Sequence, residues 1–146
     1  MMKNAICIGF GAIGAGIASV FGGWDAAMAT LMIFILADYV TGLIVAGVFH
    51  NSPKTENGAL ESNAGIKGLL RKGGMLLVVL IAVRLDLLLG YHFIRDGVVI
   101  AFIANEAISI VENLGLMGVP IPAPINRAIE VLKKRADEKT NERNEE

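Results

Sequence analysis

The stretch AAMATLMIFILADYVTGLIVAGV, residues 26–48, contains a single charged side chain, that of Asp38. The hydrocarbon core of a bilayer, roughly 30 Å thick, requires about 20 predominantly apolar residues of a helix that crosses it. The low charge continues upstream, because Asp25 is the only other charged residue between Asn4 and Val48. This part of the chain therefore predicts membrane-spanning helices.

The composition of the whole chain supports the same prediction. Of its 146 residues, 54% are hydrophobic and 18% are charged, and the mean hydropathy is +0.60. Globular chains average roughly 45–50% apolar and about 25% charged residues. We therefore expect a small all-α integral membrane protein.

Four apolar blocks predict about four transmembrane helices within a domain over residues 1–125. A polar loop over residues 49–74 divides them, and its basic residues Lys67, Arg71 and Lys72 predict a short helix on the membrane surface. Residues 126–146 predict a charged cytoplasmic amphipathic helix and tail. The predicted spans are residues 4–23, 26–48, 75–90 and 97–116.

The basic residues also predict the orientation. Lys and Arg accumulate in cytoplasmic loops close to the ends of spans. Lys3, the Lys67 cluster and the run Lys133–Arg135 share one side of the membrane if the chain crosses it four times. We therefore expect both termini in the cytoplasm.

Ionisable residues inside the predicted spans are candidates for function, because each costs about 2.5–3.5 kcal/mol on insertion scales unless it finds a partner. Asp38, Arg84 and Asp86 are such residues. Arg84 and Asp86 are two positions apart on a helix and point in different directions. We expect Arg84 to pair with Asp38 or Glu106, or to extend toward the nearer interface.

The fourth span predicts a helix with one polar face. At 100° per residue its polar side chains occupy an arc of about 120°, which we expect to line a pore. The opposite side, with Ile100, Ile103, Ile110, Val111 and Leu114, is expected to face lipid. The residues of the polar arc are Asn105, Glu106, Ser109, Glu112 and Asn113.

Several other classes of protein are disfavoured. A net charge of −1 argues against nucleic-acid binding, and the single Cys7 excludes an intrachain disulfide. His50 and His92 have no Cys or carboxylate at metal-ligand spacing, so we expect no metal and no cofactor. Glu106 and Glu112 lack a His or a nucleophilic Ser beside them, so we expect no catalytic site and no enzyme activity.

The run GFGAIG, residues 9–14, matches the dinucleotide-binding pattern G-x-G-x-x-G. The chain after it stays apolar and lacks the helix and acidic strand end of such a unit. We interpret Gly11, Ala12, Ala15 and Gly16 instead as small residues that let helices approach closely. A signal peptide is a further alternative, since Lys3 precedes an apolar stretch and Ala27-Met28-Ala29 resembles a cleavage site, but we expect this segment to remain as a span.

A set of short motifs, in a fixed order from Trp24 to Pro122, resembles the bacteriophage lysis and toxin-secretion holin family. Single elements are weak, whereas the ordered set is specific. The motifs are Trp24-Asp25, Asp38-Tyr39-x-Thr41-Gly42, Ser62-x-x-Gly65-x-Lys67-Gly68-x-x-Arg71-Lys72, Leu85-Asp86, Asn105-Glu106-x-x-Ser109-x-x-Glu112-Asn113 and Gly118-Val119-Pro120-x-Pro122.

The resemblance implies a protein of the bacterial inner membrane that associates with itself and opens lesions. A cell-wall hydrolase, or in related systems a toxin, would leave the cytoplasm through them. Its partners would be the lipid bilayer and further copies of itself, with no nucleic acid. The alternative is a small oligomeric channel or transporter subunit in which Asp38, Arg84 and Glu106 form a gating set.

Overall fold

The computed structural model describes residues 2–141, and every regular element in that range is helical, which confirms the predicted all-α class. Residues 142–146 of the predicted tail lie outside the described range. The elements are α1 (Met2–Val20), α2 (Ala26–Ile44), a π-helical turn η1 (Val45–Phe49), α3 (Ser62–Leu89), α4 (Ile94–Leu116) and α5 (Ala123–Asn141).

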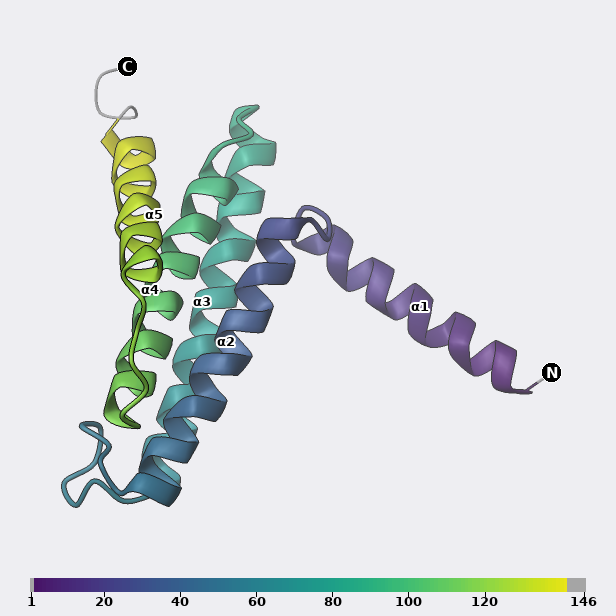
Figure 1. Ribbon diagram of the computed structural model, residues 1–146. Coiled ribbons are helices and arrows are strands. Elements are labelled where there is room, and N and C mark those ends of the chain that lie inside the picture. Colours follow the sequence, from purple (N-terminus) through teal and green to yellow (C-terminus); the bar gives the residue numbers. More distant parts are fainter. Residues whose placement is uncertain (1, 142–146) are drawn as a thin grey trace.

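Helices α2, α3 and α4 form a bundle, with α5 packed along α4 (Figure 1). The colours of Figure 1 show that α2 and α4 run in the same direction and that α3 runs in the opposite one. Helices α2 and α4 pack directly against each other. Helix α1 leaves the bundle at the start of α2 and projects away from it. The centre of the bundle is apolar, and its fully covered members are Met28, Leu31, Val79, Val99 and Ile103.

Local sequence features set the ends of the helices. Asp25 caps α2, since its Oδ1 accepts a hydrogen bond of 2.8 Å from the backbone N–H of Met28. Gly22 and Gly23, with φ of 79° and 101°, separate α1 from α2. Gly90 ends α3 in the left-handed conformation, and Gly118 follows the end of α4 with φ of 81°.

The structure corrects the division of the third segment. A basic surface helix and a separate span from residue 75 were expected, but α3 is one continuous helix of 28 residues. Gly73 and Gly74 lie in its interior, where each glycine costs only about 1 kcal/mol relative to alanine. No proline separates the two parts, so nothing stops the helix between them.

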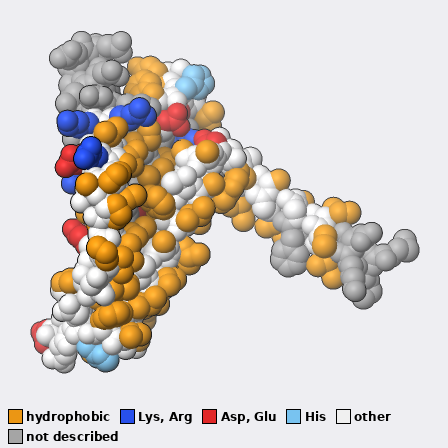
Figure 2. Space-filling view, viewed as in Figure 1, with side chains coloured by type: hydrophobic (Ala, Val, Ile, Leu, Met, Phe, Trp, Pro, Cys, Tyr) orange, Lys and Arg blue, Asp and Glu red, His pale blue; other side chains and the backbone are white. Residues whose placement is uncertain are grey.

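Among the residues that the structure describes, two helical segments, rather than the expected four, are long and apolar enough on those grounds alone to cross a membrane. They are Ala26–Phe49 and Ile94–Leu116. Only 22% of the first apolar window and 33% of the second are buried inside the molecule. The core helices of a soluble domain are mostly buried, and these two segments are not. Figure 2 shows hydrophobic side chains along the exposed side of α2.

Helix α1 contains the glycine-rich run at residues 9–14. The run lies inside a helix that extends from Met2 to Val20, and not at the turn between a strand and a helix that dinucleotide binding requires. A Cβ atom added at Gly11 or Gly16 would meet no other atom within 4 Å. The predicted close packing of Gly11, Ala12, Ala15 and Gly16 therefore has no partner within the described chain and stays a prediction about a neighbouring molecule.

Candidate functional site

One charged side chain from each helix of the bundle meets the others in its interior. Asp38 lies on α2, Lys72 on α3 and Glu106 on α4. The Nζ atom of Lys72 donates a hydrogen bond of 2.7 Å to Oδ2 of Asp38 and also forms an ion pair with Glu106. All three side chains are at least nine-tenths buried. We call this arrangement the Asp38–Lys72–Glu106 cluster.

Asn113 extends the cluster on the side of α4. Its Nδ2 donates to Oδ1 of Asp38 at 3.0 Å and to Oγ1 of Thr41 at 2.9 Å. Thr41 in turn donates to the backbone carbonyl of Ala37 at 2.8 Å. Asp38 and Thr41 of α2 thus provide hydrogen-bond acceptors for Asn113 on the polar face of α4.

The cluster holds one cation between two carboxylates. Removing one partner from a buried ion pair leaves an uncompensated charge and costs about 3–5 kcal/mol. Without Lys72, the buried carboxylates of Asp38 and Glu106 would repel each other. Each member of the cluster comes from a different helix, so this repulsion would act between helices. The packing of α2, α3 and α4 thus depends on all three side chains together.

The structure corrects the predicted partner of the two carboxylates. Arg84 was expected to pair with Asp38 or Glu106, or to extend toward the nearer interface. Its side chain is exposed and Lys72 takes the place beside the carboxylates, so of the two expectations only the pairing is wrong. The two basic residues are twelve positions apart on α3, which turns them about 120° from each other and separates them by about 18 Å along the axis. Arg84 thus points away from the cluster.

Lys72 was also expected on the membrane surface beside Lys67 and Arg71. Those two side chains are exposed, whereas Lys72 is buried. The sequence does contain a signal for this difference, because Lys72 continues the buried face of α3 at helical spacing. That face consists of Lys72, Met75, Val79, Ala82, Val83 and Asp86.

The predicted polar arc of α4 divides into two parts. Glu106 and Asn113 are buried and Ser109 is half-buried, while Asn105 and Glu112 are exposed. The opposite side differs from its prediction as well, because Ile103 lies in the core of the bundle. Ile110, Val111 and Leu114 line an apolar cavity of about 390 Å³ between α4 and α5, so in the structure α5 covers the side that was expected to face lipid.

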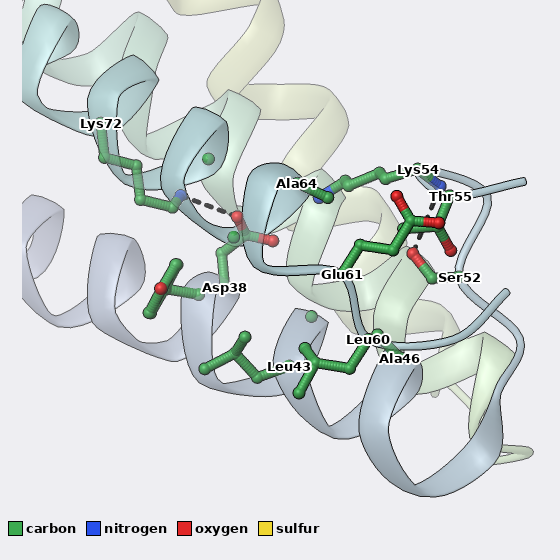
Figure 3. Close-up of a pocket in the computed structure, with 14 residues that line it drawn as sticks. Asp38, Leu43, Ala46, Ser52, Lys54, Thr55, Leu60, Glu61, Ala64 and Lys72 are labelled. Atoms are coloured by element: carbon green, nitrogen blue, oxygen red, sulfur yellow. Dashed lines mark hydrogen bonds and ion pairs between the residues drawn. The ribbon is translucent and has the colours of Figure 1, made fainter.

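A cavity of about 70 Å³ reaches the Asp38–Lys72–Glu106 cluster from the end of the bundle that carries the loop between η1 and α3. Figure 3 shows Asp38 and Lys72 at its inner end and Ser52, Lys54 and Glu61 toward the loop. Its size suits water molecules, and the side chains of Asp38, Ser52 and Lys72 in its mostly apolar wall offer them hydrogen-bond partners. Water can thus approach the ion pair through this cavity.

A second polar group lies at the opposite end of the bundle, around Arg95. Asp86 accepts hydrogen bonds from the backbone N–H groups of Ile94 at 3.1 Å and Arg95 at 2.9 Å, and so caps α4. The side chain of Arg95 donates to the carbonyl oxygen of Phe21 at 3.0 Å and pairs with Asp25. Asp86 thus fixes the turn between α3 and α4, and Arg95 joins α4 to the turn between α1 and α2.

The hydrogen bond from Arg95 holds the pKa of Asp25 below its ordinary value. Sequence analysis did not identify Arg95, because it lies in a short connection beside the end of a span. The nearby Asp25, Asp86 and Asp96 were the only indication of its role, and their convergence on one Arg depends on the fold.

Comparisons with known proteins agree with the motif analysis. A family model described as the bacteriophage holin family matches residues 15–134. The chain is 39% identical over 118 residues to an uncharacterized 14.9 kDa protein of Clostridium perfringens, covering 80% of this chain and 83% of that one. It is 32% identical over 111 residues to a probable holin of Bacillus phage phi105, covering 75% and 76% respectively.

An uncharacterized protein of Listeria monocytogenes is 37% identical over 132 residues, which covers 90% of this chain and 86% of the relative. No solved structure matches the chain.

Proposed function

Because the chain belongs to the bacteriophage holin family, we propose that it assembles in the inner membrane of a bacterium and opens lesions there. Through these lesions a cell-wall hydrolase, or a toxin, would leave the cytoplasm without needing to bind the protein. The proposal needs no catalytic group. The observation that carries it is the Asp38–Lys72–Glu106 cluster, a set of buried charges inside a bundle whose outer side chains are largely apolar.

We propose that α3 crosses the membrane together with α2 and α4. If α2 and α4 cross in the same direction, as Figure 1 arranges them, the chain must return between them, and α3 is the segment that links them. Its 28 residues span about 42 Å. Lys72 and Asp86 are buried against partners, and Arg84 is close enough to the end of α3 to reach the interface.

Helix α1 is proposed as the fourth span. Its apolar side chains are widely exposed, with Ile8 at 72% and Ile13 at 62%, which is unfavourable in water and favourable in lipid. Four spans put both termini on one side of the membrane. The exposed Lys67 and Arg71 at the start of α3 favour the cytoplasm for that side.

We propose that in the membrane α5 leaves the side of α4 along which it packs in the structure and lies at the cytoplasmic membrane surface. It begins after the turn at Gly118 and exposes Arg127, Lys133, Lys134 and Arg135. Figure 2 shows Lys and Arg side chains gathered over α5. These charges would be costly beside α4 within the bilayer, whereas an amphipathic helix at the interface keeps them in water.

Opening would exchange the internal partners of the cluster for water. In the closed molecule Lys72 neutralises part of the charge of Asp38 and Glu106, and Asn113 binds Asp38. When copies assemble and the helices separate, the same polar side chains can line a water-filled lesion. The cavity beside Asp38 and Lys72 gives water its first access to the cluster.

Induction of the chain in bacteria tests this function. A holin is expected to abolish the membrane potential abruptly at a defined time after synthesis begins. Continued growth with an ion-selective current would instead support a channel or transporter subunit. A catalytically inactive cell-wall hydrolase, expressed in the same cells, provides a marker for lesions that pass a folded protein.

A further inference from the structure

In the structure, where α5 packs along one side of α4, the remaining exposed surface of α4 differs from that of every other helix proposed to cross the membrane. Helices α1, α2 and α3 expose large apolar side chains, such as Ile8 at 72%, Leu36 at 64% and Leu77 at 61%. Within α4, which the structure describes completely, no large apolar side chain is exposed. Its exposed residues are Ala101, Asn105, Glu112 and Gly115.

These four residues form one stripe along α4. At 100° per residue they fall within an arc of about 80°, with the half-buried Ile108 inside the same arc. Positions 101, 105, 108, 112 and 115 alternate spacings of four and three, which is the pattern of helices that pair along a seam. We call these five residues the outer stripe of α4.

The other helices of the chain do not cover the outer stripe. Glu106 and Asn113 turn toward α3 and α2, and Val111 and Leu114 turn toward α5. A Cβ atom added at Gly115 would meet nothing within 4 Å. The outer stripe is therefore open along its length in the single molecule.

Contact between the outer stripe and lipid would be energetically unfavourable. Asn105 lies halfway along α4, which would put its exposed amide near the middle of the bilayer. Hydrocarbon offers that amide no hydrogen bond, and a polar side chain at this depth normally meets protein or water. Ala101 and Gly115 are small, so another helix can approach α4 closely on this side.

We propose that the outer stripe of α4 is the surface on which a second copy of the chain docks, with the two α4 helices parallel and stripe against stripe. This inference rests on the proposed function, because it requires α4 to cross the membrane. Copies inserted in one membrane share one orientation, so a twofold axis along the membrane normal brings Asn105 of each copy together. The amide group is both donor and acceptor, so two Asn105 side chains satisfy each other.

The position of Glu112 agrees with this arrangement. It lies within about 6 Å of the end of α4 at Leu116, on the side proposed to face the cytoplasm. Water reaches that depth, so two Glu112 carboxylates at a parallel seam need not be buried against each other. Ile108, between Asn105 and Glu112, supplies apolar contact within the seam.

Disulfide crosslinking in native membranes tests the proposal. The chain has one cysteine, so Cys7→Ser gives a background without thiols. Single cysteines at Ala101→Cys and Gly115→Cys report on the outer stripe, and Leu36→Cys and Leu77→Cys are exposed controls on α2 and α3. We expect both stripe variants to form covalent dimers on oxidation at least about tenfold more than the controls.

Asn105 variants in the Ala101→Cys background test the amide pair. Asn105→Leu is expected to lower the dimer yield about three- to tenfold, whereas Asn105→Gln keeps an amide and should retain most of it. Equal crosslinking at stripe and control positions would overturn the proposal, as would a yield unaffected by Asn105→Leu. In a further variant that carries Ala101→Cys and retains Cys7, preferential coupling between these two cysteines would identify α1 as the occupant and also overturn the proposal.

The membrane potential, recorded in the same cells, separates this inference from the proposed function. Collapse of the potential without stripe crosslinks would reject the docking surface and leave the holin function standing. Stripe crosslinks in cells that keep their potential would support the docking surface and reject the function.

Discussion

Lys72 on α3 and Asp38 on α2 are joined by a buried ion pair of 2.7 Å, although they are 34 positions apart in the chain. Glu106, a further 34 positions along, completes the pairing on α4. The three spans proposed to cross the bilayer are thus locked together at one level by opposite charges. These ion pairs hold the three helices together while water is excluded from the charged groups. Entry of water would weaken them.

The first prediction concerns the cation of the cluster. Lys72→Met is expected to destabilise the folded protein by about 3–5 kcal/mol, because Asp38 and Glu106 would remain buried without a partner. The measurement is the amount of protein that accumulates in the membrane. The matched control is the triple variant Asp38→Asn, Lys72→Met, Glu106→Gln, which removes all three charges and should recover much of that amount. Normal accumulation of Lys72→Met alone would show that the cluster does not hold the bundle.

The second prediction concerns Glu106. Glu106→Gln keeps the size and the hydrogen-bonding capacity of the side chain, so this variant should insert but shift the time at which the membrane potential collapses. Glu106→Leu should abolish lesions, because it offers water no polar group. Membrane abundance and the time of potential collapse are measured together. If both variants are instead scarce in the membrane, Glu106 has only a structural role.

The third prediction concerns Asp25 and Arg95. Because the pKa of Asp25 is lowered in the folded protein, its carboxylate stabilises the fold above the pKa of the unfolded chain, and this contribution is lost as the pH falls through the lowered folded value. The melting temperature in detergent should therefore fall as the pH drops below about 5, chiefly below the ordinary Asp pKa of about 3.9. Asp25→Asn should remove part of that fall, and Asp96→Asn, at the longer contact of 3.2 Å, should remove less. Identical pH profiles for all three proteins would contradict this assignment.

Much of the fold follows from the sequence because the hydropathy blocks and the end signals are local. Asp25 lies directly before α2, Gly90 directly after α3, and Gly118 with Pro120 shortly after α4, and each of them stands beside a hydropathy block in the sequence. The continuity of α3 was missed because its charges suggested a surface location. In the fold, one of those charges, Lys72, has two buried partners that no local pattern reveals.

Part of the candidate site could be predicted from local sequence, and the rest depends on how the helices pack. Asp38 and Glu106 stand out as charges within apolar stretches, which local composition shows. Their common partner depends on the rotation of α3 about its axis, and the exposure of Asn105 depends on which sides of α4 face α2, α3 and α5. Both are properties of packing between helices, and a hydropathy plot does not contain them.

The fourth prediction concerns α1. Gly16→Leu and Gly11→Leu should weaken association between copies, because a large side chain separates helix backbones that small residues bring close. The measurement is the ladder of oligomers produced by chemical crosslinking in membranes. Ile13→Leu, a change of similar size on the same helix, serves as the control. Ladders unchanged by both glycine substitutions would show that this face of α1 meets lipid.

The fifth prediction concerns orientation. Protease added to intact spheroplasts should spare a tag placed after Glu146, because α5 and the C-terminus are proposed to lie in the cytoplasm. Permeabilised spheroplasts, in which the tag should be cut, provide the control. Loss of the tag from intact spheroplasts would exclude the four-span arrangement.

The polar side chains of the bundle are proposed to open a lesion large enough for a folded protein. The most direct test measures the membrane potential and the extracellular amount of a co-expressed, catalytically inactive cell-wall hydrolase after induction, with the Glu106→Leu variant at matched abundance as the control. We predict that the potential collapses abruptly in cells with the native chain, that the hydrolase appears outside at the same time, and that neither event occurs with Glu106→Leu. Retention of the hydrolase while ions cross selectively, or equal release by the variant, would contradict the account.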